Sequence, residues 1–192
     1  VRGVDGLTAN TIADALGTST QPIFTAFGSM DDIRSAAYAA AVSLYDSYTD
    51  EGLRDAVPFL GVGRQYIRFA REEPELYRLL FLTRSKEYSA MASMRHLQEH
   101  VRPTLMRIYR ITAEEADFYF RDMWLVVHSL ATLIVTNECP YSDEELALLL
   151  TGFSVSIYKA IREIPGFAAG VFDRDAVFRA LAGGDEGKAP VK

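Results

Sequence analysis

Two histidines and a glutamate stand close together in the segment His96-Leu-Gln-Glu-His100. On a helix, positions four apart share a face, so the histidines would suit two ligands of a zinc ion and Glu99 a general base. A catalytic zinc needs a third protein ligand, and the sequence fixes none. The neighbours Arg95, Gln98 and Arg102 are typical of a solvated face. We therefore expect no metal site here, with adventitious metal binding as the weaker alternative.

The other reactive residues lack catalytic partners. Cys139 is the single cysteine, which excludes a disulfide framework and a multi-cysteine zinc cluster. No glycine-rich phosphate loop follows a strand, and no Gly-x-Ser-x-Gly elbow occurs. Cys139 adjoins Pro140 in a predicted turn, where redox sensing is an alternative role. The sequence thus predicts a protein that is not an enzyme and that uses no cofactor.

Length and composition favour a folded protein that lies outside membranes. The 192 residues are 49% hydrophobic with a net charge of −6, which fits one compact domain or a small module fused to a larger one. The strongest uncharged apolar run, residues 123–137, is shorter than the ~20 residues that span a bilayer. No secretory signal opens the chain, which begins with valine, so we expect a cytoplasmic protein with a further segment upstream.

Apolar residues recur at helical spacing almost throughout, so we expect an all-α fold. Thr8 is a preferred N-cap, and Gly17 suits the left-handed stop of a first short helix. Ser19 can cap a second short helix that has Pro22 in its first turn and ends at Gly28. The inward sides of these helices are predicted to contain Ile12, Ala13, Leu16, Ile23 and Phe27, with Phe24 also on the apolar side of the second helix.

A longer helix follows, capped at Ser29 and broken at residues 50–52. Its expected buried stripe is Ile33, Ala36, Ala37, Ala40, Ala41, Leu44 and Tyr48. The two short helices and this long one form a predicted helix-turn-helix unit. Beyond it we expect helices around residues 59–70, 76–81 and 91–108, the last kinked at Pro103. Capping boxes at Thr112 and Ser142 open two more helices, which run to about residues 137 and 164.

The last two helices carry more apolar surface than one buried face requires. In a chain this short, the simplest way to bury that surface is against a second copy, in a four-helix interface formed by residues of about 113–137 and 143–164. A central helix pair in a monomeric bundle is the alternative. The residues concerned are Met123, Trp124, Val126, Val127, Leu130, Ala131, Leu133 and Ile134, then Leu146, Leu148, Leu149, Leu150, Phe153, Val155, Ile157 and Ile161.

The segment from Leu7 to Ile33 resembles the DNA-binding module of the tetracycline-repressor (TetR) family of bacterial regulators. The matching features are Thr8, Ile12-Ala13, Leu16-Gly17, Ser19, Ile23-Phe24, Phe27, Ser29 and Asp31-Asp32-Ile33. The resemblance implies a helix-turn-helix DNA-binding domain in residues 1–48, with most of its first helix upstream. It also implies a larger ligand-binding and dimerisation domain in residues 49–183, followed by a flexible tail in residues 184–192.

In such a module the second helix of the motif enters the major groove, and residues near its N-terminus reach base edges. The resemblance therefore implies a double-stranded, palindromic DNA operator bound by a homodimer. Gln21 suits paired hydrogen bonds to an adenine edge. The residues expected to contact DNA are Thr8, Thr18, Ser19, Thr20, Gln21, Phe24 and Thr25.

Several residues depart from the family pattern. Phe24 replaces a common tyrosine, Met30 a usual lysine and Ala26 a frequent histidine, and each change removes a phosphate contact. Residues 1–50 hold two basic side chains against six acidic ones. The alternative function is therefore a ligand-binding or protein-interaction dimer of the same fold that does not bind DNA specifically.

Aromatic and methionine side chains on the later helices predict a roomy apolar site, although each taken singly is typical of a core. His128 either orients a ligand or bonds a backbone carbonyl, and we favour the second interpretation. The resemblance implies a repressor that an effector releases from DNA, and these side chains suggest that the effector is small and apolar or aromatic. The expected ligand contacts are Tyr66, Phe69, Tyr77, Phe81, Met106, Met123, Trp124 and His128.

Overall fold

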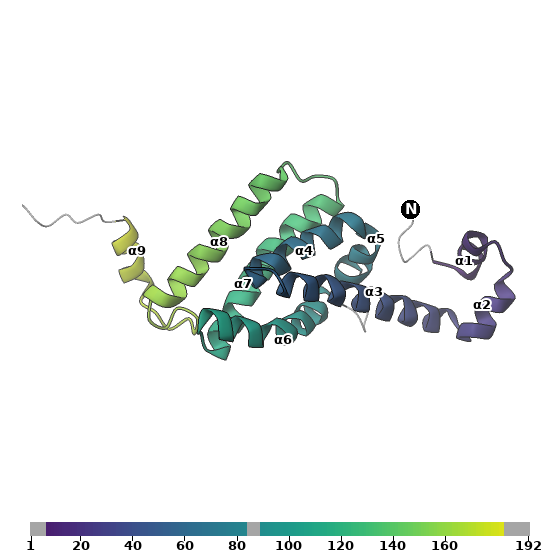
Figure 1. Cartoon of the computed structure of the whole chain (residues 1–192), viewed down its shortest axis with the longest axis horizontal. Coiled ribbons are helices and arrows are strands. Elements are labelled where there is room, and N and C mark those ends of the chain that lie inside the picture. Colours follow the sequence, from purple (N-terminus) through teal and green to yellow (C-terminus); the bar gives the residue numbers. More distant parts are fainter. Residues whose placement is uncertain (1–6, 84–88, 183–192) are drawn as a thin grey trace, which may run out of the picture.

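A computed structural model describes residues 7–83 and 89–182, and every regular element in those ranges is a helix (Figure 1). The predicted all-α fold is therefore confirmed. The expected end of a first helix in residues 1–6 and the tail after residue 183 lie outside the described residues. The N-terminal unit consists of α1 (Ala9–Leu16), α2 (Thr20–Phe27) and the start of the long helix α3 (Met30–Leu53).

A cap at the start of α1 and a glycine after each helix explain why α1 and α2 are so short. The Thr8 hydroxyl accepts a hydrogen bond from the amide of Thr11, and the Thr11 hydroxyl oxygen accepts one from the amide of Thr8. Gly17 and Gly28 end α1 and α2 with φ values of 64° and 69°, which glycine adopts without steric cost. The predicted ends of both helices are confirmed.

The long helix α3 leads from the N-terminal unit into the body of the molecule. It runs to Leu53, so the break predicted at residues 50–52 is wrong, and the boundary predicted after residue 48 falls inside the helix. Gly52 serves close packing instead of a turn, because a Cβ there would lie 2.6 Å from the amide nitrogen of Val62. A Cβ on Gly61 would lie 2.3 Å from the Gly52 carbonyl oxygen. This glycine pair lets α3 and α4 approach closely.

The body is a bundle around α7, which packs against α4, α6 and α8. In Figure 1 the N-terminal unit projects from one end of this bundle and α9 from the other. The elements of the body are α4 (Pro58–Glu72), α5 (Pro74–Tyr77), the π-helical η2 (Arg78–Leu82), α6 (Ala90–Tyr109), α7 (Ala113–Val135), α8 (Asp143–Glu163) and α9 (Arg174–Ala182).

The two capping boxes predicted in the body are confirmed. Thr112 accepts from the amide of Glu115, and Ser142 accepts from the amide of Glu145, with each glutamate bonding back to the cap amide. By length and composition alone α7 is apolar enough to cross a membrane, but 44% of its most apolar window is buried inside the bundle. Its buried side chains, among them Phe120, Met123 and Leu130, belong to the large hydrophobic core of the bundle.

The face that α3 buries differs from the predicted one. Ala36, Ala40 and Leu44 are exposed, whereas Tyr45 and Thr49 are buried. Because alanines occur at most positions between residues 36 and 41, the pattern fits more than one buried face of α3. The face that is buried is the one that places the large Tyr45 side chain in the core of the body. The helix α9 was not predicted. It is a short amphipathic segment, and none of its residues is buried.

Candidate functional site

The N-terminal unit is held together by a core of one residue from each helix: Ala13, Ile23 and Ile33. Leu16 and Phe27 do not join this core and are 68% and 43% exposed, so the prediction that they pack inward is wrong. Each is the last residue of an eight-residue helix. The small core therefore leaves apolar surface on the described part of the unit.

The structure gathers the residues predicted to contact DNA around the start of α2, with Thr8 at the start of α1. All are exposed except the half-buried Thr20. The Thr25 hydroxyl donates to the Gln21 carbonyl at 2.9 Å, which directs it back along the helix. Ser19 has the backbone conformation of an N-cap but makes no side-chain capping bond, contrary to expectation. Its hydroxyl thus does not satisfy the first amides of α2.

The charge of this surface is unusual for a DNA-facing module. Residues 7–33 contain no lysine or arginine and three aspartates. The next cation along the chain, Arg34, bonds Asp31 at 2.9 Å. Within residues 7–33, hydroxyls, amides and helix ends are therefore the groups that could donate to an anion such as phosphate.

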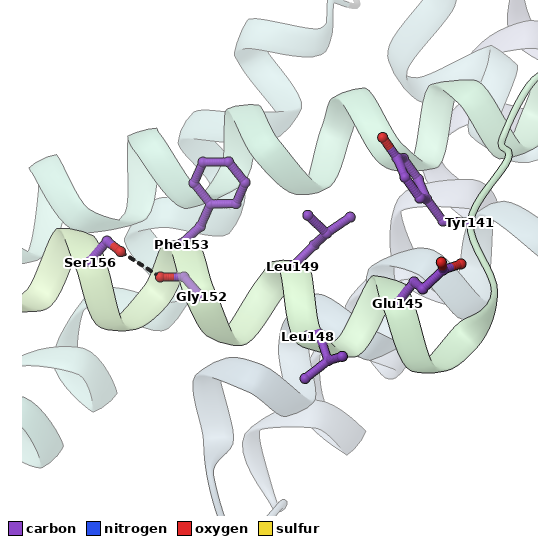
Figure 2. Close-up of a pocket in the computed structure, with 7 residues that line it drawn as sticks. All are labelled: Tyr141, Glu145, Leu148, Leu149, Gly152, Phe153 and Ser156. Carbon is purple, nitrogen blue, oxygen red and sulfur yellow. Dashed lines mark hydrogen bonds between the residues drawn. The ribbon is translucent and has the colours of Figure 1, made fainter.

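A second candidate surface is an apolar groove along α8, shown in Figure 2. It has a volume of about 610 Å³. Leu148 and Phe153 are 72% and 46% exposed, and Gly152 leaves open space beside them. Along α7, by contrast, most of the apolar residues are buried within the chain. The remaining groove residues are Tyr141, Glu145, Leu149 and Ser156.

Five of the predicted ligand residues form one packed cluster in the body. The indole of Trp124 stacks on His128 with 4.5 Å between ring centroids and 8° between planes. Tyr77 stacks on the same imidazole at 6.0 Å, and Phe81 lies 5.2 Å from Tyr66. These contacts come from helices α4, α5 and α7 and from η2, so the cluster joins four elements of the bundle.

His128 is the polar centre of this cluster. Its Nδ1 lies 3.0 Å from the hydroxyls of both Tyr66 and Tyr77. Tyr77 has further acceptors in the His128 carbonyl and Thr132 Oγ1, so Tyr66 is the natural donor to Nδ1. Burial lowers the pKa of His128, which favours the neutral ring with its proton on Nε2. The partners of the ring nitrogen are thus tyrosine hydroxyls, and the backbone carbonyl expected from the sequence is not one of them.

The other three predicted ligand residues lie elsewhere. Phe69 is fully buried against Tyr45 and Tyr48, and Met123 is buried in the same large core. Met106 is 36% exposed on α6 and is not part of that core. The predicted set is therefore only partly brought together.

Tyr45 is a buried polar residue that the sequence analysis missed. Its ring packs against Tyr66, Phe69 and Phe81, with centroids 5.2–5.6 Å apart. In the described part of the chain, its hydroxyl has no hydrogen-bond partner, and neither has Trp124 Nε1. Burial raises the pKa of Tyr45 well above its usual value, so the hydroxyl stays protonated. A buried donor left unpaired costs about 1–3 kcal/mol.

A cavity of about 210 Å³ lies beside Tyr45, between α3, η2 and α6. At its rim the Tyr38 hydroxyl and Ser93 Oγ are 3.2 Å apart. The helical spacing of Tyr38, Val42 and Tyr45 could have indicated this site in the sequence. It was missed because the prediction placed the alanines of α3 on the buried face. The lining residues are Tyr38, Val42, Tyr45, Leu80, Ala92, Ser93 and His96.

The two histidines of the candidate zinc motif each bond an aspartate on α3. His96 Nε2 lies 3.0 Å from Asp46, and His100 Nε2 lies 2.8 Å from Asp50. Among the described residues no group of three or more potential ligands is placed to hold a metal ion. The arrangement links α6 to α3 at two successive turns, so the motif acts here as a contact between helices.

Comparison with known proteins bears on the body of the molecule. Residues 59–151 match a family model described as a tetracyclin repressor-like C-terminal domain. This range runs from the start of α4 to the middle of α8 and contains the His128 cluster. None of the curated proteins matches the chain. The family consists of regulators and not of enzymes. This match supports the predicted membership of the tetracycline-repressor (TetR) family.

Proposed function

We propose that the chain is a ligand-responsive transcriptional regulator that binds palindromic operator DNA as a homodimer in the cytoplasm. The observation that carries this proposal is the continuity of α3. Its first residue follows the Ser29 cap next to α2, and its last turns pack against α4 in the body. A rigid helix of this kind converts a shift in the body into a displacement of α2.

The DNA contacts of the proposal come from α2. Gln21 is exposed one residue after the start of the helix, where its amide suits an adenine edge. A dimer places two such helices about 34 Å apart, in successive major grooves. An effector that favours another geometry of the body lowers the population with that spacing, which makes the protein a repressor released by its ligand.

The dimer contacts of the proposal come from the groove on α8. Exposed Leu148 and Phe153 line this groove, and burial against a second copy would remove their apolar surface from water. Leu148→Glu would place a charge there and is expected to yield monomers in sedimentation velocity at micromolar concentration. Glu144→Gln, an exposed change on the same helix, is the control and should stay dimeric. A wild-type protein that is monomeric would contradict this part.

The test of DNA binding is an anisotropy titration of the full protein against the DNA upstream of its own gene. It is run at low and moderate salt with excess non-specific competitor. We expect competitor-resistant binding that Gln21→Ala weakens about fivefold to 150-fold, the range for one bidentate base contact. Gln98→Ala on the distant helix α6 is the matched control and should bind like the wild type.

The charge of the N-terminal unit favours one alternative, a dimer of the same fold that binds ligands or proteins without reading DNA. The absence of lysine and arginine from residues 7–33 motivates it. Loss of all binding under competitor, at both salt concentrations, would establish this alternative and refute the proposed operator recognition.

A further inference from the structure

The cavity under α3 is separate from both the groove on α8 and the interior of the His128 cluster. Its walls come from three elements, so a molecule inside it would touch α3, η2 and α6 together. Tyr45 forms one wall, and the other side of the same ring contacts Tyr66 and Phe81. The cavity is thus next to the packed cluster, with Tyr45 between them.

The chemistry of the walls selects an uncharged occupant. Val42, Leu80 and Ala92 supply apolar surface. The imidazole of His96 is already bonded to the Asp46 carboxylate, and Ser93 Oγ bonds both Tyr38 and the Leu80 carbonyl. Within the described residues, therefore, the lining offers an ionic ligand no unbalanced charge.

Tyr45 provides the polar element that an occupant can use. It is 3% exposed and has no hydrogen bond to lose, because its hydroxyl has no partner in the described structure. Because Tyr45 lines the cavity, its hydroxyl can donate to an acceptor of a molecule bound there, which would remove the cost of an unpaired buried donor. A hydrogen bond of this kind distinguishes ligands that have an acceptor from those of equal shape that lack one.

The volume limits the size of the occupant. Pockets for drug-sized molecules measure about 300–1,000 Å³. The cavity of about 210 Å³ is smaller and fits a single ring with a short substituent.

We propose that this cavity is the effector site and binds a small uncharged molecule, a single ring bearing a carbonyl oxygen that accepts a hydrogen bond from Tyr45. The role of this molecule as an effector rests on the function proposed above, whereas the site and the class of ligand rest on the lining of the cavity. The two helix-linking contacts at its edge, Tyr38 with Ser93 and His96 with Asp46, connect its occupancy to the position of α3.

The experiment measures binding of three probes to the full protein without DNA, by saturation-transfer NMR titration. Acetophenone has the ring and the carbonyl, ethylbenzene has the ring alone, and benzoate carries a charge. We expect acetophenone to bind about fivefold to tenfold more tightly than ethylbenzene, as one hydrogen bond allows, and benzoate not to bind. Tyr45→Phe should abolish the preference for acetophenone and leave the binding of ethylbenzene unchanged.

Two further variants locate the site. Ala92→Leu fills the cavity and should abolish binding of both neutral probes. Tyr158→Phe is the matched control, because its hydroxyl bonds the Tyr109 carbonyl and Tyr158 does not line the cavity, so binding should be unchanged. Thermal unfolding of each variant checks that it is folded.

Failure of the inference can be told apart from failure of the proposed function. Absence of acetophenone binding, an undiminished preference in Tyr45→Phe, or full binding in folded Ala92→Leu would each overturn the inference. None of these results involves DNA. A protein that binds acetophenone as described but shows no operator binding would confirm the site and refute the regulator function.

Discussion

The N-terminal unit and the body bury their apolar residues on very different scales. The unit has one core residue from each of three helices. The body surrounds α7 with a continuous core in which Phe69, Tyr77 and Tyr119 are fully buried. Because free energy of folding grows with the apolar area buried, the body should be stable and the unit marginal. The part proposed to read DNA is thus held mainly through its attachment to α3.

The N-terminal unit and the body also differ in whether side-chain hydrogen bonds join separate helices. Body helices are joined across elements by bonds such as Arg78 to the Val135 carbonyl at 2.5 Å and Tyr119 to Ser154 at 2.6 Å. Side-chain bonds described within residues 7–34 stay within one helix and its cap, as in Thr8 with Thr11 and Arg34 with Asp31. The comparison indicates a rigid body attached to an adaptable N-terminal unit.

The largest expected effect is in the body. Phe69→Ala removes a fully buried ring between α3 and α4 and should lower the free energy of unfolding by about 3–5 kcal/mol. Thermal unfolding by circular dichroism should show a midpoint lower by roughly 10 °C. A shift of less than about 2 °C would mean that the body does not depend on this core.

A smaller and local effect is expected in the N-terminal unit. Ile23→Ala removes the largest contribution of α2 to the three-residue core, at a local cost of about 2–4 kcal/mol. Hydrogen exchange of α1 and α2 should accelerate strongly while exchange in α7 is unchanged. The half-buried Ile12→Ala is the control and should give a weaker local effect. Equal destabilisation of α7 would show that the two regions unfold together.

Because residues 7–33 contain no lysine or arginine, one added cation on α2 should raise the affinity for operator DNA. Ala26 is exposed on α2, and Ala26→Lys should raise operator affinity about fivefold and steepen the slope of log K against log salt by about 0.9. Ala26→Gln controls for side-chain length and should change neither quantity. An unchanged slope in the lysine variant would mean that this face of α2 does not lie against the phosphate backbone.

The smallest effect concerns pH and the body. Because burial lowers the pKa of His128 below the unfolded value of about 6.5, the unfolded chain binds more protons between the two values. The contribution of neutral His128 to the free energy of unfolding is therefore complete above about pH 6.5. It is lost as the pH falls towards the pKa of His128 in the folded protein. Partial exposure keeps it well below the limit of about 1.4 kcal/mol per pH unit. Between pH 7 and pH 5 the thermal midpoint should fall less in His128→Gln than in the wild type. Equal falls in the two proteins would exclude His128 as the source of this pH dependence.

Local signals explain which features the sequence could predict. The Thr112 and Ser142 caps, the stop at Gly17 and the helix around residues 59–70 depend on residues within one or two turns, and the structure agrees with them. The site depended on contacts between helices. The phase of α3 was decided by where Tyr45 fits against α4 and η2, and the aspartate partners of His96 and His100 lie 50 residues away. Such pairings cannot be obtained from periodicity alone.

The central claim is that the α1–α2 unit reads a specific DNA sequence despite its lack of cations. The most direct measurement is the ratio of affinities for the upstream DNA and for a shuffled duplex of equal length and composition, at physiological salt. The account predicts a ratio of about 10³ or more, as in specific regulators. A ratio near one would contradict it and favour the alternative, a dimer of the same fold that binds ligands or proteins without recognising an operator.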